Sequence, residues 1–182
     1  GSKAIITQDA TEISRAEKIV LPGVGAFSDG MKNLRDLGLF DLLNQVVLKE
    51  GKPLLGICLG MQLLGSSGDE MERTAGLNWI PGEVKRFKPS SLEKLKVPHV
   101  GWNSISLIGS ENKLLNNIDE KSDFYFVHSY HFLAAPPYVT SLCHHGSDFV
   151  SSVQKDNIYG TQFHPEKSQE LGLKIILNFA NL

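Results

Sequence analysis

Cys58 is the residue whose type and context most clearly predict a chemical role. It lies in residues 53–62 (PLLGICLGMQ), where an apolar, strand-like run leads into a Gly-x-Cys-x-Gly turn and then into a helix-like segment. In the related Gly-x-Ser-x-Gly elbow, the flanking glycines permit a sharp turn that exposes a nucleophile above a sheet. A helix N-terminus at this point would favour thiolate over thiol. The pattern predicts a nucleophile; the alternative is a buried cysteine acting as a small apolar side chain.

A base for this thiol is predicted in residues 160–168 (GTQFHPEKS). If this segment ends a strand, His164 and Glu166 lie on one face, because strand side chains alternate. The carboxylate could then accept a hydrogen bond from one imidazole nitrogen while the other nitrogen faces the sulfur. Taken alone, His-Pro-Glu is equally compatible with an ordinary strand exit. Together with Cys58, it favours a Cys-His-Glu triad.

Several blocks in their order resemble the class I (triad) glutamine amidotransferases. Beside the elbow, these are residues 21–27 (LPGVGAF), 98–103 (PHVGWN), 126–130 (FVHSY) and 162–168 (QFHPEKS). They are most similar to one branch of the family, the glutaminase subunits of imidazole glycerol phosphate synthases, over nearly the whole chain. The resemblance implies hydrolysis of L-glutamine to glutamate and ammonia, with no cofactor and no metal. Cys58 would be the nucleophile, His164 the proton carrier and Glu166 the group that orients it.

The resemblance also implies roles for residues around the triad. Oxyanion donors would be the backbone amide of Leu59 and the turn formed by Gly23, Val24 and Gly25, whose glycines would let the central peptide rotate. Glutamine would be bound by Gln62, Glu70, His128, Ser129 and Tyr130. Gln62 lies one helical turn after Cys58, so the two can share a face. Taken singly, each of these five would more often be an ordinary surface or core polar residue.

An ammonia-producing subunit implies an acceptor, because ammonia released into water is lost to protonation. The resemblance implies a heterodimer with a cyclase subunit, a (βα)8 barrel that makes imidazole glycerol phosphate and an aminoimidazole carboxamide ribotide. The contact residues would be His99, Trp102, Asn103 and Lys167. Trp102 is the preferred anchor, because tryptophan is enriched among interface hot spots. A core tryptophan is the alternative.

Composition favours a single enzyme domain over residues 1–182. Hydrophobic residues make up 41% of the chain and charged residues 21%, and the net charge is −2. This balance gives no electrostatic signature for nucleic acid or an anionic membrane. Two cysteines without a paired framework fit a reducing compartment, so a cytoplasmic location is expected. Cys143 is predicted to be a strand residue without a chemical role.

The order of segments predicts an α/β fold, and the resemblance implies a three-layer arrangement of flavodoxin-like topology. Its central, mostly parallel sheet would be flanked by helices, with additional antiparallel strands in the C-terminal half. A helix is expected over residues 29–49 with a break at Gly38, and another over 171–182. Strands are expected at 4–7, 18–21, 54–57, 84–87, 105–107, 124–127, 139–142 and 149–153. The resemblance also implies a strand and helix before Lys3, which this sequence does not contain.

Two alternatives to this function stay open at the level of sequence. One is a related subunit that supplies ammonia for the amidination of surface sugars, with which residues 130–132 and 145–149 would be compatible. The other is a catalytically silent scaffold that stabilises its partner. The intact Cys58, His164 and Glu166 argue against the second.

Overall fold

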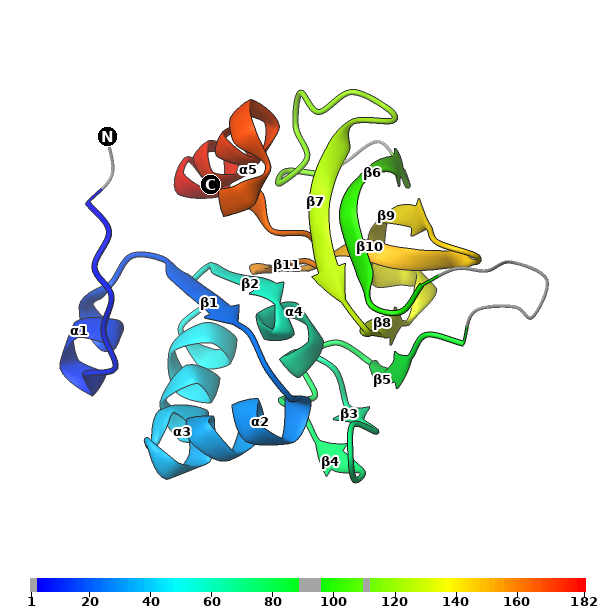
Figure 1. Ribbon diagram of the computed structural model, residues 1–182. Coiled ribbons are helices and arrows are strands. Elements are labelled where there is room, and N and C mark those ends of the chain that lie inside the picture. The colour runs from blue at the N-terminus through cyan, green and yellow to red at the C-terminus, as the bar shows by residue number, and fades with distance from the viewer. Residues whose placement is uncertain (1–2, 89–95, 110–111) are drawn as a thin grey trace.

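A seven-stranded mixed sheet forms the centre of the protein, for which the computed structural model describes residues 3–88, 96–109 and 112–182. The strand order is β1-β2-β11-β10-β9-β6-β7 (Figure 1). Its members are β1 (Ile19–Gly23), β2 (Leu54–Cys58), β6 (His99–Leu107), β7 (Asp123–His128), β9 (Val139–His144), β10 (Asp148–Lys155) and β11 (Ile158–Thr161). The predicted α/β class is therefore confirmed.

The balance of parallel and antiparallel pairs differs from the expectation. Among the described strands of this sheet, the parallel pairs are the two that involve β2, which has β1 on one side and β11 on the other. Every pair from β11 to β7 is antiparallel. The prediction of a mostly parallel sheet is wrong on this point, because the short links between β9, β10 and β11 can join only antiparallel neighbours.

Helices cover both faces of this sheet. They are α1 (Ala10–Arg15), α2 (Phe27–Asp36), α3 (Leu39–Leu43), the π-helix η1 (Asn44–Lys49), α4 (Leu59–Leu63) and α5 (Gln169–Ala180), with short 3-10 helices η2 (Pro136–Tyr138) and η3 (Pro165–Lys167). Leu54 packs in one buried cluster with Met31 and Val47, whereas its neighbour Leu55 packs in another with Ile175. Alternate residues of β2 thus serve two cores, as expected of a strand buried on both faces. Figure 1 shows α2 and α3 on one side of the sheet and α5 on the other.

The long helical pattern predicted over residues 29–49 is interrupted where expected. α2 ends at Asp36, and Gly38 takes a left-handed conformation with φ 68° before α3 begins. Glycine adopts this conformation without the steric cost that a Cβ would impose.

Within the described part of the chain, no helix is both long and apolar enough to cross a membrane.

Two parts of the fold were not predicted correctly. Residues 4–7 form no strand, and Ile5 and Ile6 are exposed, because a strand requires a hydrogen-bonded neighbour and β1 pairs only with β2 among the described strands. A second sheet of order β4-β3-β5-β8 was not expected. It consists of β3 (Ser67–Gly68), β4 (Thr74–Ala75), β5 (Gly82–Arg86) and β8 (Tyr130–Ala134). Of β8, only Phe132 is fully buried, which leaves a weak apolar pattern.

The helix that follows β2 approaches the sheet very closely. A Cβ placed on Gly60, in α4, would lie 1.8 Å from the carbonyl oxygen of Leu21 in β1. A Cβ on Gly56 would lie 2.7 Å from the carbonyl group of Gly60. The two glycines that flank Cys58 are thus required because backbone segments touch, not only because the turn is sharp.

We therefore expect Gly60→Ala to lower the free energy of unfolding by at least about 3 kcal/mol, since the contact is with backbone that cannot rotate away. Gly38→Ala is the matched control: no atom lies within 4 Å of its added Cβ, and the left-handed backbone alone should cost about 1 kcal/mol. Urea unfolding of both variants checks this. Equal stability losses would contradict the close-approach argument.

Candidate active site

Cys58 occupies a strained turn between β2 and α4. Its backbone angles are φ 53° and ψ −107°, a combination that residues other than glycine rarely adopt. Such conformations persist where the surrounding structure fixes them, and they cluster at functional sites. The residue is 7% exposed. The predicted elbow is present, and its cysteine is buried.

His164 and Glu166 form the expected pair, but not on a strand. Nδ1 of His164 lies 2.7 Å from Oε1 of Glu166. β11 ends at Thr161, and Glu166 belongs to the 3-10 helix η3, so the alternation argument used for the sequence is wrong. A turn folds the carboxylate back onto the ring instead. The backbone amide of His164 donates to the carbonyl of Tyr125 at 2.9 Å, which anchors the turn to β7.

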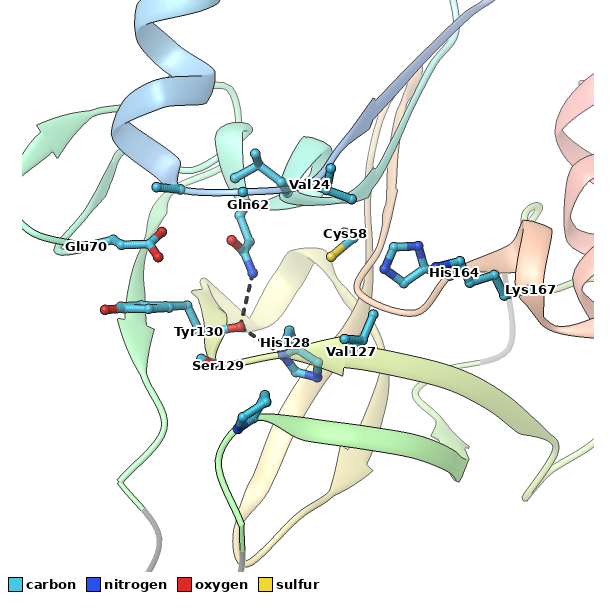
Figure 2. A pocket seen from close by; sticks show the side chains of 14 residues that line it. Val24, Cys58, Gln62, Glu70, Val127, His128, Ser129, Tyr130, His164 and Lys167 are labelled. Carbon is cyan, nitrogen blue, oxygen red and sulfur yellow. Dashed lines mark hydrogen bonds between the residues drawn. The ribbon is translucent and has the colours of Figure 1, made fainter.

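A cavity of about 450 Å³ joins the thiol to the imidazole. Figure 2 shows Cys58 and His164 next to each other at one end of this cavity. Because Nδ1 is engaged by Glu166, Nε2 is the nitrogen that can take a proton from the thiol. Nε2 is buried and has no hydrogen-bond partner among the described residues. A buried base without a partner, beside a nucleophile and open space, is arranged for proton transfer.

Burial keeps the thiol protonated in this structure. It raises the pKa of Cys58 to about 11, and nearby Glu166 acts in the same direction. Hydrogen bonds from the Leu59 amide and from Gln162 lower the pKa, but by less. The expectation of a thiolate stabilised by a helix N-terminus is therefore wrong for this cysteine, since desolvation outweighs the donors of the short helix α4. The proton must leave when substrate is attacked.

The predicted oxyanion donors lie partly around the cavity. Leu59, Val24 and Gly25 line it, and the Leu59 amide already points at the sulfur. Gly25 has φ 101°, a conformation that only glycine adopts easily. Gly23 does not line the cavity; it ends β1 in register with Cys58. The structure therefore gives Gly23 no place among the groups that could contact an oxyanion; it only leads from β1 into the turn.

All five residues predicted to bind glutamine line the cavity (Figure 2), namely Gln62, Glu70, His128, Ser129 and Tyr130. Oε2 of Glu70 accepts a hydrogen bond from the backbone amide of Phe27 at 2.8 Å. The cavity thus has a carboxylate at one end and the thiol and imidazole at the other. This polarity suits a ligand with a cationic group and an electrophilic group several bonds apart.

Comparison with known proteins agrees with this geometry. The family profile described as glutamine amidotransferase class-I matches residues 3–181. The chain belongs to this family. It is 46% identical to imidazole glycerol phosphate synthase subunit HisH 1 of Campylobacter jejuni over 182 residues, which is 100% of this chain and 89% of that protein. It is 49% identical to subunit HisH 2 of Methanococcus maripaludis over 180 residues, 98% of this chain and 87% of that protein.

Solved structures support the fold of this amidotransferase. A crystal structure titled glutamine amidotransferase superposes with a TM-score of 0.69 at 17% identity, covering 97% of this chain and 85% of the other. The structure of PurLQS from Thermotoga maritima superposes with a TM-score of 0.65 at 19% identity, covering 91% and 79%. At such identities, the likeness concerns the fold alone.

The residues predicted to contact a partner separate into two groups. Trp102 is 48% exposed, and Lys167 is exposed beside the cavity with its Nζ 5.9 Å from the ring centre of Tyr125. His99 is only 4% exposed, so its predicted place on a contact surface is wrong. It points inward because β6 alternates, and Asn103 is held at the sheet by donating to the carbonyl of His144 at 2.8 Å.

Gln162 is the site residue of this amidotransferase that sequence reasoning missed. It is fully buried, and its Nε2 lies 3.6 Å from Sγ of Cys58. A signal was available, since Gln162 precedes His164 by two positions in the same block that carries the predicted base. Cys143 is buried in β9 and does not line the cavity, as expected of a residue without a role here. In residues 3–88, 96–109 and 112–182, no cluster of potential metal ligands occurs.

The raised pKa of Cys58 predicts how the thiol reacts in the absence of glutamine. Alkylation by iodoacetamide should still accelerate between about pH 8 and 10, because the thiolate fraction grows tenfold per pH unit below the pKa. Mass spectrometry of the Cys58 peptide gives the rate, and Cys143→Ala removes the other thiol. A rate that levels off near neutral pH would show that a thiolate is present at rest, contrary to the argument above.

Proposed function

We propose that this chain is the glutaminase subunit of an imidazole glycerol phosphate synthase. It hydrolyses L-glutamine to glutamate and ammonia and passes the ammonia to a cyclase subunit in histidine biosynthesis. The observation that carries the proposal is the buried thiol and imidazole that share one cavity with Glu70. The 46% and 49% identity to named subunits of that synthase, over nearly the full chain, supports the same branch of the family.

The first half-reaction forms a thioester. Nε2 of His164 takes the proton of Cys58 as the sulfur attacks the side-chain amide carbon of glutamine. The negative oxygen that develops is held by the Leu59 amide and by an amide of the turn at Val24 and Gly25. The imidazolium then gives its proton to the departing nitrogen, and ammonia leaves. Glu166 stabilises the imidazolium through its 2.7 Å contact with Nδ1.

The second half-reaction releases glutamate. Water enters the space that ammonia has left, and Nε2 of His164 removes its proton as it attacks the thioester carbon. The second tetrahedral intermediate uses the same donors. As it collapses, the carbon–sulfur bond breaks, the sulfur takes the proton from the His164 imidazolium, and glutamate is released. The enzyme returns to the neutral thiol that its buried position favours.

Substrate is held by the end of the cavity away from the imidazole. The Glu70 carboxylate can bind the α-ammonium group, while Ser129 and Tyr130 line the wall beside it. Nε2 of Gln62 donates to the carbonyl of Tyr130 at 3.0 Å, which ties α4 to this wall. Fixing both ends of glutamine places the amide carbon against the sulfur, the geometry that lowers the entropic part of the barrier.

We propose that the exposed face of β6 and β7 contacts the cyclase subunit, a (βα)8 barrel, in a heterodimer. Val100 and Trp102 of β6 and Val127 of β7 are 55%, 48% and 36% exposed. Val100 pairs with Val127 across the strands, so these side chains form a continuous apolar surface. Val127 also lines the cavity, which places this surface next to the point where ammonia forms. A subunit with this role in histidine biosynthesis would be located in the cytoplasm.

We expect Cys58→Ala to abolish synthesis driven by glutamine while leaving synthesis from ammonium salts within about twofold, since the acceptor chemistry belongs to the cyclase. The loss should exceed about a thousandfold. Both assays use the chain together with a cyclase subunit, and Cys143→Ala is the control. Equal loss of both activities would mean that the change acts through folding. If the wild-type protein hydrolyses glutamine but transfers no ammonia to this cyclase, the result would instead support the alternative function, a subunit that supplies ammonia for the amidination of surface sugars.

Trp102→Ala should weaken the complex with the cyclase subunit. Removing a half-exposed tryptophan from an interface centre typically costs about 2 kcal/mol or more, a thirtyfold rise in Kd. Leu173→Ala on α5 is the matched control, since Leu173 is 55% exposed on another part of the surface. Titration calorimetry of both variants gives the affinities. Equal values for the two would remove Trp102 from the proposed interface.

A further inference from the structure

The sulfur of Cys58 has a second polar neighbour beside the triad. Nε2 of Gln162 lies 3.6 Å from Sγ, and the Gln162 side chain is wholly buried. A glutamine amide has an oxygen and a nitrogen of nearly equal size, and only the nitrogen can donate. Which of the two faces the sulfur therefore decides whether Gln162 favours or opposes a negative charge on it.

The neighbours of Gln162 fix this choice. The carbonyl of Tyr130 can only accept, so the group of Gln62 that lies 3.0 Å from it must be the NH₂ group. The same NH₂ group lies 3.0 Å from Oε1 of Gln162 and donates its second hydrogen there. The oxygen of Gln162 is thus occupied, and its NH₂ group is the one left to face the sulfur.

A pair of buried histidines holds the same carbonyl from the other side. Nδ1 of His128 lies 2.8 Å from the Tyr130 oxygen and must carry the hydrogen of that bond. Nε2 of a neutral His128 is then an acceptor, and Nδ1 of His99 donates to it at 3.1 Å. Nε2 of His99 in turn accepts from Asn103 at 3.2 Å. Burial lowers the pKa of His128 to about 3 and that of His99 to about 4, so both rings stay neutral near pH 7.

We propose that Gln162 acts directly on the nucleophile: its amide donates the hydrogen bond that holds the Cys58 sulfur and stabilises the thiolate formed when His164 removes the proton. Gln62 and His128 are the positioning residues, because both bind the Tyr130 carbonyl that sets the direction of the amides. A donor to a buried anion is worth more than the same donor in water. The catalytic part of this inference rests on the proposed function, whereas the effect on the thiol does not.

The competing explanation is that Gln162 only fills space and satisfies Gln62. In that case, an apolar side chain of similar length would change stability but not the reactivity of the sulfur. Gln162→Met tests this, because methionine keeps the unbranched shape and removes the donor. Gln154→Met is the control: Gln154 is a half-buried glutamine in β10 that does not line the cavity.

The measurement is the rate of Cys58 alkylation by iodoacetamide at about pH 8, below the thiol pKa, where the rate follows the thiolate fraction. We expect Gln162→Met to react about tenfold more slowly than the wild-type protein, and Gln154→Met to react at the wild-type rate. Glutamine hydrolysis should show a similar fall in kcat with KM changed less than about threefold. A folded Gln162→Met protein that is alkylated at the wild-type rate or faster overturns the proposal.

A second variant covers the case in which Gln162→Met does not fold. Gln62→Leu removes the donor that occupies the Gln162 oxygen, so the Gln162 amide can turn and alkylation should again slow, here severalfold. An unchanged rate in this variant would likewise overturn the proposal. Absence of glutamine hydrolysis by the wild-type protein with its cyclase would defeat the proposed function alone, since the alkylation rates are measured without glutamine.

Discussion

The contact between α4 and the backbone of β1 is the constraint on which the site depends. Gly60 lies so close to the Leu21 carbonyl that no side chain fits between them. This contact forces the chain to turn sharply at Cys58 and explains the unusual backbone angles there. The same turn directs the Leu59 amide at the sulfur. A strained nucleophile and its nearest donor therefore follow from one packing requirement.

Parallel pairing supplies the second part of the arrangement. β2 lies beside β11, with Ile57 in register with Thr161, so both strands end at the same edge of the sheet. Cys58 ends the first strand, and His164 follows the end of the second by three residues. Residues more than a hundred positions apart thus meet without any long side chain. The antiparallel part of the sheet then provides the opposite wall of the cavity through β7 and the residues after it.

The sequence was sufficient to predict that Cys58, His164 and Glu166 lie together, and less so to predict their surroundings. Cys58, His164 and Glu166 could be predicted because each sits in a local pattern with a chemical meaning. The thiol pKa could not, since it depends on burial by residues from several elements. The inward position of His99 and the position of Gln162 beside the sulfur were missed for a similar reason: each is set by neighbours distant in sequence, such as His128 and Gln62. The 3-10 helix that contains Glu166 was not predicted, because the two-residue spacing of His164 and Glu166 also fits a strand.

The walls of the cavity come from segments spread over most of the chain, from the turn at Val24 to η3 near Lys167. The thiol, the imidazole and the Glu70 carboxylate share the cavity only when these segments are folded together. Turnover of glutamine is accordingly a reporter of complete assembly of the polypeptide, more stringent than helical content or compactness. Molecules in which one half of the chain is folded and the other half is not would hydrolyse no glutamine.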